Sequence, residues 1–371
     1  MKQPVLYQTL EEDIQRISSD VMQEKRLLDE AVDLFTEAQT YKVSGNNGSI
    51  EDYWYFLYPF KGFTLANTKH YKLLGRYLAG MIPKETEVIV SIESDGIGIA
   101  TFVAGELALP LIISKSFHYN VPCVQLVQEA GYHKRDMYLS KVIEGKKVAI
   151  VDCMVSTGGT VKALVAAIES LPQTEIMGIY CVNDKHNYRE TDKTLYGYPY
   201  KYLITTHITP ETGKVNAELS YDLKHAFWKA MDERFFDITE TCSTFSNVSK
   251  RGYGVGSIIV DAQNFDILAW GFRRGKLHAE QDAVTMLKQN CPDWSTRQLT
   301  VYSTMEPCIY RNDAGHIPCA EHIAELKNCK WVIIGSKDAA DERIYGEGIK
   351  YLLEQGKYIR LIESDEVFRP A

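Results

Sequence analysis

The residues best suited to chemistry are a histidine, a glutamate and two cysteines in the C-terminal third of the chain. His278 and Glu280 are separated by one residue, and Cys308 and Cys319 each follow a proline. A catalytic zinc ion takes three protein ligands and leaves a fourth position for water. We therefore expect His278, Cys308 and Cys319 to bind Zn²⁺, which lowers the pKa of its water to about 7. Glu280 would carry the proton of that water without binding the metal.

Two other interpretations of these residues stay open. Free cysteines are often buried in a core without binding anything. Alternatively, His316 and His322 flank Cys319 and could complete a structural zinc finger, which would leave Glu280 without a function.

The H-x-E pattern followed by two Pro-Cys pairs is similar to that of zinc deaminases. Ten residues separate Cys308 from Cys319, a spacing that resembles the riboflavin-biosynthesis branch of the cytidine-deaminase superfamily. The Gly-Glu-Gly-Ile run at 346–349 resembles a helix start in that branch, and Asn247 resembles its substrate-contacting asparagine. The resemblance implies hydrolytic deamination, by zinc-bound hydroxide, of an amino-bearing pyrimidine or purine-like base or its ribonucleotide.

A second motif lies in the first half of the chain. An apolar strand at 148–152 leads into the loop Ser156-Thr157-Gly158-Gly159-Thr160, and a helix is expected from Val161 to Leu171. Backbone N–H groups at the start of a helix that follows such a loop bind phosphate well. The sequence therefore predicts a phosphate site here.

This motif resembles the 5-phosphoribosyl-1-pyrophosphate (PRPP) motif of type I phosphoribosyltransferases, most closely the adenine enzymes. The resemblance implies that Mg²⁺ accompanies PRPP and that residues 60–64 belong to a hood over the base. It assigns Glu93 and Ser94 to a pyrophosphate loop, and Lys134 and Arg135 to a mobile loop that closes over PRPP. The residues that it assigns to PRPP are Asp152, Ser156, Thr157, Gly158, Gly159, Thr160, Glu93, Ser94, Lys115, Lys134 and Arg135.

One position departs from that family. Two adjacent acids are the rule there, and here Cys153 follows Asp152. Losing one charge-assisted contact to a ribose hydroxyl could cost about 1.5–3 kcal/mol. Three readings remain: a working transferase, a domain that binds PRPP or a nucleotide and regulates the deaminase, and a glycine-rich loop without phosphoribosyl binding.

The expected elements divide the chain into two α/β domains. Apolar strands at 87–92, 111–113 and 147–152 alternate with helices, which predicts a parallel sheet covered on both faces. We expect a helical segment at 1–50, a type I phosphoribosyltransferase fold at 51–215 and a three-layer α/β/α cytidine-deaminase-like fold at 221–371. The turn-rich stretch from Thr209 to Ser220 marks the expected boundary.

Composition limits the remaining possibilities. The 371 residues are 45% hydrophobic and 24% charged, which is typical of a globular enzyme. A net charge of −8 argues against a nucleic-acid-editing deaminase, because nucleic-acid binders usually carry a basic excess. Eight cysteines without a disulfide pattern, and no signal peptide or membrane span, predict a cytoplasmic protein. Relatives of both domains are commonly oligomeric, so we expect a homo-oligomer. A degenerate structural partner in a complex is the remaining alternative to an enzyme.

Overall fold

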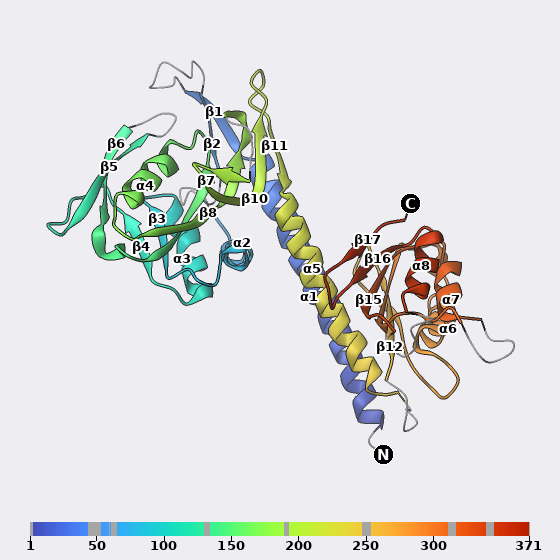
Figure 1. Ribbon diagram of the computed structural model, residues 1–371. Coiled ribbons are helices and arrows are strands. Elements are labelled where there is room, and N and C mark those ends of the chain that lie inside the picture. Colours follow the sequence, from blue (N-terminus) through green and yellow to red (C-terminus); the bar gives the residue numbers. More distant parts are fainter. Residues whose placement is uncertain are drawn as a thin grey trace. The chain divides into compact units, whose positions relative to one another are not determined.

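The computed structural model describes residues 3–43, 53–58, 60, 65–129, 134–188, 193–246, 254–310, 317–338 and 345–370. The chain divides into two compact units (Figure 1). Residues 25–227 form one, called here the phosphate-loop unit, and residues 1–24 with 228–371 form the other, called the metal-site unit. The helices α1 (Gln3–Thr36) and α5 (Tyr221–Ser243) each contribute residues to both units.

The phosphate-loop unit is built on a seven-stranded sheet in the order β11-β10-β8-β7-β3-β4, with β9 paired to β10. The five strands from β10 to β4 run parallel, while β11 and β9 pair antiparallel to β10. The predicted parallel sheet is therefore confirmed. Its strands are β3 (Val88–Ile92), β4 (Leu111–Ser114), β7 (Lys147–Val155), β8 (Glu175–Lys185), β9 (Thr194–Leu195), β10 (Tyr198–Ile208) and β11 (Val215–Leu219).

The order in which the chain visits the strands determines which face of the sheet each connecting helix covers. α3 (Gly96–Leu107) connects β3 to β4, and α4 (Gly159–Glu169) connects β7 to β8 in the opposite direction across the sheet. Because such crossovers are right-handed, a reversal of direction places the two helices on opposite faces. α2 (Thr68–Met81) packs against α3, and Asn67 caps its first turn by accepting a hydrogen bond from the Lys69 N–H at 2.9 Å.

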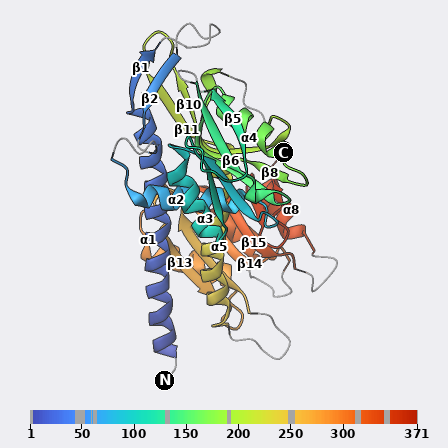
Figure 2. The same cartoon turned by 90° about the vertical axis from the view of Figure 1, so that its left-hand side faces the viewer.

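Two antiparallel pairs complete the phosphate-loop unit. β1 (Gln39–Val43) pairs with β2 (Tyr53–Leu57), and β5 (Cys123–Glu129) pairs with β6 (Lys134–Ser140). The β5–β6 ribbon lies beside α4 in both views (Figures 1 and 2). Short 3₁₀ turns follow β6 at Lys141–Ile143 and β8 at His186–Tyr188.

The metal-site unit has a six-stranded sheet in the order β13-β12-β14-β15-β16-β17. The connections from β14 to β15 and from β15 to β16 run in one direction, which places α7 and α8 on the same face, where α6 also packs. α5 lies on the other face, so the unit has three layers, as predicted (Figure 1). Its elements are β12 (Gly256–Asp261), β13 (Ile267–Phe272), α6 (Ala279–Asn290), the 3₁₀ turn Trp294–Thr296, β14 (Leu299–Met305), α7 (Cys319–Glu325), β15 (Cys329–Ser336), α8 (Glu347–Glu354), β16 (Tyr358–Leu361) and β17 (Val367–Phe368).

A buried polar network fastens α5 to this sheet. Asp232 on α5 accepts hydrogen bonds from the Tyr302 hydroxyl at 2.7 Å and from Nη1 of Arg360 at 2.5 Å. Arg360 also contacts Asp365 at 2.7 Å, and Lys229 pairs with the same carboxylate at 2.6 Å. Burial raises the pKa of Asp232, so its charged form depends on these partners.

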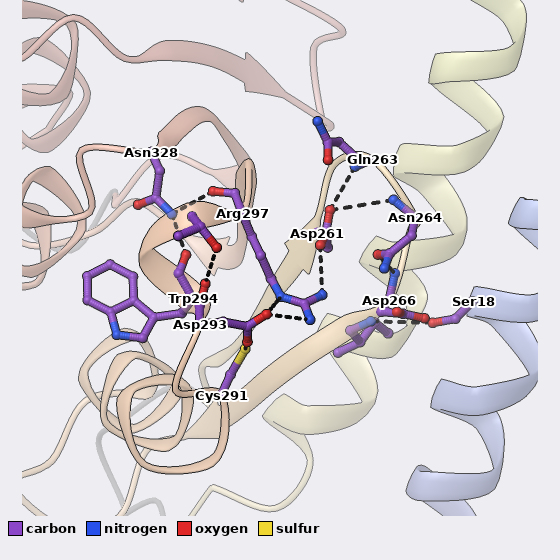
Figure 3. Close-up of polar contacts among 12 residues, drawn as sticks. Ser18, Asp261, Gln263, Asn264, Asp266, Cys291, Asp293, Trp294, Arg297 and Asn328 are labelled. Carbon is purple, nitrogen blue, oxygen red and sulfur yellow. Dashed lines mark hydrogen bonds and ion pairs between the residues drawn. The ribbon is translucent and has the colours of Figure 1, made fainter.

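A second polar cluster fixes the turn between β12 and β13 (Figure 3). Arg297 lies between Asp261 of β12 and Asp293 beyond α6, with nitrogen–oxygen distances of 3.0 Å to each carboxylate. Asp261 also accepts the Gln263 N–H at 2.9 Å. Ser18 of α1 accepts the Ile267 N–H at 3.4 Å, so the first part of α1 belongs to this framework.

The structure differs from the sequence prediction at two places in the phosphate-loop unit. The segment 1–50 was expected to be helical, but α1 ends at Thr36 and Gln39–Val43 form the strand β1. The turn-rich stretch after β10 was expected to be a linker, but β11 lies within it and adds an antiparallel strand to the sheet. Asn183, Asp184 and Lys185 are of residue types that usually lie at the surface. They form the end of the buried strand β8 and are completely inaccessible to solvent.

None of the helices in the described part of the chain combines the length and the apolar character that a bilayer crossing requires.

Candidate active sites

The predicted zinc ligands lie at the ends of three secondary-structure elements, which bring them together. His278 directly precedes α6, Cys308 follows β14, and Cys319 is the first residue of α7. The His278 Nδ1 lies 3.5 Å from the Cys308 Sγ and 3.3 Å from the Cys319 Sγ. All three donor atoms lie within 4.8 Å of one another. This is the spacing that three ligands of one tetrahedral zinc ion need.

The pKa values of the two thiols also fit the binding of a doubly charged metal ion. The hydrogen bond from Cys319 and the contact with His278 lower the pKa of Cys308 to about 4. The hydrogen bond to Cys308 and burial raise the pKa of Cys319 well above its ordinary value. One thiolate therefore forms readily, while a second negative charge beside it requires a cation between the sulfur atoms. Zn²⁺ supplies that charge and prefers this donor set.

Hydrogen bonds to the backbone hold the three segments that carry the ligands in fixed positions. The Gln281 side chain on α6 accepts the His278 N–H at 3.3 Å and donates to the Ile317 carbonyl at 2.9 Å. The Ala320 N–H donates to the Cys308 carbonyl at 3.0 Å, which joins the two cysteine segments directly. The three donor atoms are thus positioned by the fold, in part independently of a metal.

Glu280 lies beside the three ligands, in the first turn of α6. Its side chain is only 3% exposed, and its Oε1 accepts a hydrogen bond from the Ser303 hydroxyl at 2.9 Å. Burial raises the pKa of the carboxyl group. A cavity of about 100 Å³ is lined by Glu280, His278, Cys308, Arg273 and others. A group with a raised pKa that faces such a cavity is suited to accept and return a proton.

Glu306 is a site residue that the sequence reasoning missed. It precedes Pro307-Cys308, is 4% exposed, and its two carboxylate oxygens accept four backbone N–H groups. Oε1 accepts from Gly348 and Ile349 at 2.9 and 3.1 Å, and Oε2 from Gly346 and Asp338 at 3.0 and 3.2 Å. The carboxylate therefore ties the Cys308 segment to the start of α8. The Gly-Glu-Gly-Ile run at 346–349 was noticed in the sequence, but nothing there indicated that Glu306 contacts it.

Gly348 explains the close fit of α8 to this segment. A Cβ atom on Gly348 would lie 2.0 Å from the Pro307 carbonyl oxygen, which is far inside van der Waals contact. Only glycine lets the helix start approach the backbone next to Cys308 so closely.

Glu306→Gln is expected to loosen the zinc site. The amide keeps one acceptor oxygen and places an NH₂ group against two backbone donors, which costs about 1–3 kcal/mol for each buried group left unpaired. Because Glu306 positions the Cys308 segment, zinc affinity should fall about 10–100-fold. Chelator competition measures the affinity. Glu347→Gln is the matched control, since Glu347 in the first turn of α8 is 39% exposed and its ion pair among the described residues is a long one, with Lys350. Equal zinc affinities for the two variants would contradict the positioning role.

The predicted phosphate loop lies where β7 ends and α4 begins. A cavity of about 150 Å³ is lined by Asp152, the loop residues 156–160, and Glu93, Ser94 and Arg135. Gly158 has a left-handed backbone with φ of 84°, which turns the loop into the helix. The N–H groups at the start of an eleven-residue helix thus border the cavity.

The β5–β6 ribbon closes one side of this cavity. Arg135 donates to the Glu93 carbonyl oxygen and, at 2.6 Å, to Oε1 of Gln128. Gln128 in turn donates to the Thr160 hydroxyl at 3.2 Å. Two predicted basic residues lie apart from the cavity lining: Lys115 bridges Tyr138 through its backbone, and Lys134 pairs with Glu129 at 2.6 Å. Asn247 lies outside the described residues, as do residues 61–64 of the expected hood.

Gly159→Ala is expected to disrupt this cavity. A Cβ atom there would lie 2.1 Å from the Glu129 carbonyl oxygen, so the ribbon or the loop must shift by about 1 Å. A misplacement of that size can cost about 10²-fold, and we expect the Kd for PRPP to rise by that factor in calorimetry. Gly105→Ala on α3 is the control, because nothing lies within 4 Å of its added Cβ. Unchanged PRPP affinity in Gly159→Ala would refute the placement of the phosphate.

Two tyrosines, Tyr53 in β2 and Tyr58 directly after it, also line this cavity, and the sequence did not indicate them. The Tyr53 hydroxyl lies 3.1 Å from the Ser156 Oγ, and the Tyr58 hydroxyl lies 3.0 Å from the Cys153 Sγ. Tyr58 is completely buried, which raises its pKa well above the usual value. Cys153 therefore faces a tyrosine at the position where the resembling family carries its second acid.

The two candidate sites define an α/β protein of two units, which combines a loop suited to binding phosphate with a residue cluster suited to binding zinc. Comparison with known families agrees. The family described as "Phosphoribosyl transferase domain" matches residues 66–201. The family described as "Cytidine and deoxycytidylate deaminase zinc-binding region" matches residues 229–336.

Curated relatives match the first of these regions. A hypoxanthine/guanine phosphoribosyltransferase of Methanothermococcus okinawensis is 32% identical over 166 residues, which are 44% of this chain and 89% of the relative. The Methanococcus voltae protein of the same description is 31% identical over 45% of this chain and 89% of its own length. The chain therefore belongs to the phosphoribosyltransferase family, and it carries a zinc-binding deaminase region in addition.

Solved structures similar to parts of the chain come from both kinds of protein. An adenine phosphoribosyltransferase from Thermoanaerobacter pseudethanolicus matches with a TM-score of 0.37 and 20% identity, over 48% of this chain and 99% of that protein. A diaminohydroxyphosphoribosylaminopyrimidine deaminase/5-amino-6-(5-phosphoribosylamino)uracil reductase from Thermotoga maritima matches with a TM-score of 0.32 and 24% identity. That match covers 37% of this chain and 38% of the Thermotoga protein.

The family matches confirm the predicted combination of a phosphoribosyltransferase domain with a zinc deaminase domain, and the predicted fold class. Together the two domains indicate an enzyme of nucleotide metabolism with small-molecule substrates. The zinc-binding region supports Zn²⁺ as its metal.

Proposed function

We propose that the metal-site unit deaminates an amino-bearing pyrimidine or purine-like base, or its ribonucleotide, and that the phosphate-loop unit transfers a phosphoribosyl group from PRPP. The observation that carries the proposal is the convergence of His278, Cys308 and Cys319 on a cavity that Glu280 also lines. A structural zinc site would have no use for a buried carboxylate beside it. The core-thiol and zinc-finger readings of the cysteines are less well supported for this reason.

The chain's own groups have distinct tasks in the deamination. Zn²⁺, when bound by His278, Cys308 and Cys319, supplies a Lewis acid that lowers the pKa of water to about 7. Glu280 takes one proton from the attacking water and delivers it to the ring nitrogen, and it then moves the remaining hydroxyl proton to the amino group, which leaves as ammonia while the ring carbonyl forms. Ser303 holds the Glu280 carboxylate by its 2.9 Å hydrogen bond. Glu306 keeps the Cys308 segment in place, and the helix start at Ala279 favours negative charge in the cavity.

In the transferase step, positioning is the main contribution of the chain. The N–H groups of the 156–160 loop would hold the 5-phosphate, and Asp152 would hold a ribose hydroxyl. Asp152, Glu93 and Asp95 line the cavity and offer the hard carboxylate oxygens that Mg²⁺ prefers. Mg²⁺ with PRPP is therefore part of the proposal. Arg135 would neutralise the pyrophosphate group from the ribbon.

A second candidate function is a deaminase regulated by a binding-only phosphate-loop unit. The Tyr58–Cys153 hydrogen bond favours it, because that thiol is 2% exposed and already has a partner. A ribose hydroxyl would then find a single carboxylate, Asp152, where the resembling family offers two. PRPP binding without pyrophosphate release would identify this case.

The deciding experiment measures pyrophosphate and ammonia together. Zinc-loaded protein is incubated with PRPP, Mg²⁺ and a panel of aminopurines and aminopyrimidines. Release of both products supports the bifunctional proposal and names the base. Ammonia without pyrophosphate supports the binding-only alternative, and release of neither product overturns both.

The proposal keeps several predictions from the sequence. The predicted domain limits 51–215 and 221–371 belong to it with one adjustment, because β1 and β11 extend the first domain at its two ends. A cytoplasmic location and a homo-oligomeric state also belong to it. Size-exclusion chromatography with light scattering checks the oligomer directly.

A further inference from the structure

Gln128 lines the cavity beside the phosphate loop, between two other residues of the lining. We propose that Gln128 is a positioning residue for PRPP. Its neutral amide holds Arg135 in place without neutralising it, so that the guanidinium keeps its charge for the pyrophosphate group. The inference rests on the proposed binding of PRPP, which both candidate functions share, and it names a residue on which recognition of the pyrophosphate depends.

Gln128 occupies an inward-facing position of the β5–β6 ribbon. Side chains alternate between the two faces of a strand. Along β5, Leu126 and Gln128 are buried, while Gln125, Val127 and Glu129 are exposed. Leu126 is of the residue type that such a buried face favours, whereas a buried amide needs hydrogen-bond partners for its oxygen and its nitrogen. The partners of Gln128 therefore indicate why an amide lies there.

Both ends of the amide have a partner. Its Oε1 accepts a hydrogen bond from Nε of Arg135 at 2.6 Å, and its Nε2 donates to Oγ1 of Thr160 at 3.2 Å. Arg135 is the cross-strand partner of Gln128 in the ribbon, whereas Thr160 lies in the first turn of α4. The amide therefore connects the guanidinium to the end of the phosphate loop.

The two groups that hold Arg135 are both neutral. Besides the Gln128 amide, the backbone carbonyl of Glu93 accepts a hydrogen bond from Nη2 of Arg135. Arg135 is the one basic side chain among the described residues that line the cavity. A planar guanidinium has five N–H donors and can bind a phosphate group through two of them in parallel. An amide at position 128, rather than a carboxylate, leaves that charge available to an anion.

The neighbouring cross-strand pair of the ribbon has the opposite arrangement. Glu129 is the register partner of Lys134, and their side chains form an exposed ion pair of 2.6 Å. A carboxylate neutralises the cation there, and Lys134 lies apart from the cavity lining. In the adjacent pair, which faces the cavity, an amide takes the place of the carboxylate. The ribbon thus neutralises the cation outside the cavity and keeps the one inside it charged.

Gln128→Glu tests the charge directly, because glutamate keeps the shape of glutamine. The carboxylate still accepts from Arg135, and the Thr160 hydroxyl can turn to donate to it, so the melting temperature should not fall. The guanidinium is then neutralised. We expect the Kd for PRPP with Mg²⁺, measured by calorimetry without a base, to rise about 10–100-fold, the effect of losing one charged hydrogen-bonded contact. The Kd for ribose 5-phosphate, which lacks the pyrophosphate group, should change little.

Three further variants show whether the effect passes through Arg135. Gln125→Glu adds the same charge at an exposed position of the same strand and should leave both affinities unchanged. Gln128→Met fills similar space without an acceptor, so Arg135 is no longer held and the affinity for PRPP should fall although no charge has been added. In an Arg135→Met background, Gln128→Glu should have no further effect on PRPP binding, because the group through which it acts is gone.

Unchanged affinity for PRPP in Gln128→Glu, or in Gln128→Met should the charged variant not fold, overturns the inference. An equal loss in Gln125→Glu, an equal loss of ribose 5-phosphate binding, or a full additional loss in the Arg135→Met background also overturns it, since each places the effect elsewhere. Absence of PRPP binding by the unaltered protein is a different result. It overturns both the proposed transferase and its binding-only alternative, and this inference with them.

Discussion

Glu280→Gln is expected to reduce ammonia release by about 10²–10⁴-fold, the usual contribution of a positioned general acid–base group. Glutamine matches glutamate in size and still accepts the hydrogen bond from Ser303, but it cannot carry a proton. Zinc should stay bound, because His278, Cys308 and Cys319 are unchanged. Single-turnover ammonia release and metal analysis of the same sample measure both effects.

Glu325→Gln is the control for this variant. Glu325 lies on α7 and is exposed, and its ion pair with a described residue is a long one, 3.5 Å to Lys288. It should keep full activity and full zinc content. Turnover by Glu280→Gln at the rate of this control would show that another group moves the proton.

Arg360→Met is expected to lower the free energy of unfolding of the metal-site unit by about 3–5 kcal/mol, the usual cost of leaving one member of a buried ion pair alone. Methionine fills similar space, but Asp232 then loses its 2.5 Å partner in a place where burial already raises its pKa. Urea unfolding, followed by a probe in the metal-site unit, measures the change.

A double-variant cycle separates the charge from the packing. Asp232→Leu/Arg360→Met removes both charges and should recover much of the lost stability, since an apolar pair often replaces a buried ion pair without penalty. Lys229→Met is the surface control, because its ion pair with Asp365 is 42% exposed on both sides and is worth at most about 1 kcal/mol. A double variant as unstable as the single one would point to packing, rather than to an unpaired charge.

Local sequence patterns predicted much of the fold and part of the sites. Buried strands such as β3 and β7 are continuous apolar runs, and their type follows from composition alone. The metal cluster was predictable because His278, Cys308 and Cys319 each lie at the start of a helix or the end of a strand. Such ends gather at one edge of a sheet.

Features that depend on distant partners could not be predicted in the same way. Glu306 meets Gly346 and Gly348 from 40 and 42 positions away, and Tyr58 meets Cys153 from 95 positions away. Asn183 and Asp184 are of residue types that usually lie at the surface, yet hydrogen bonds to Thr206 and Tyr200 on β10 make their burial tolerable. At these positions the structure depends on hydrogen bonds between segments that are far apart in the sequence, and a single segment does not show such bonds.

The division of α1 between the two units affects the order in which the chain matures on the ribosome. Ser18 meets Ile267 across 249 positions, and Glu24 meets Arg234 across 210. Domains generally fold as they emerge, N-terminal first, so the phosphate-loop unit can finish while the rest of the metal-site unit is still being synthesised. The beginning of α1 must meanwhile wait with apolar side chains, Leu10 and Val21 among them, that are buried in the finished protein. The nascent chain therefore exposes apolar side chains of α1 until the second domain has been synthesised, and during that interval it is most prone to aggregate.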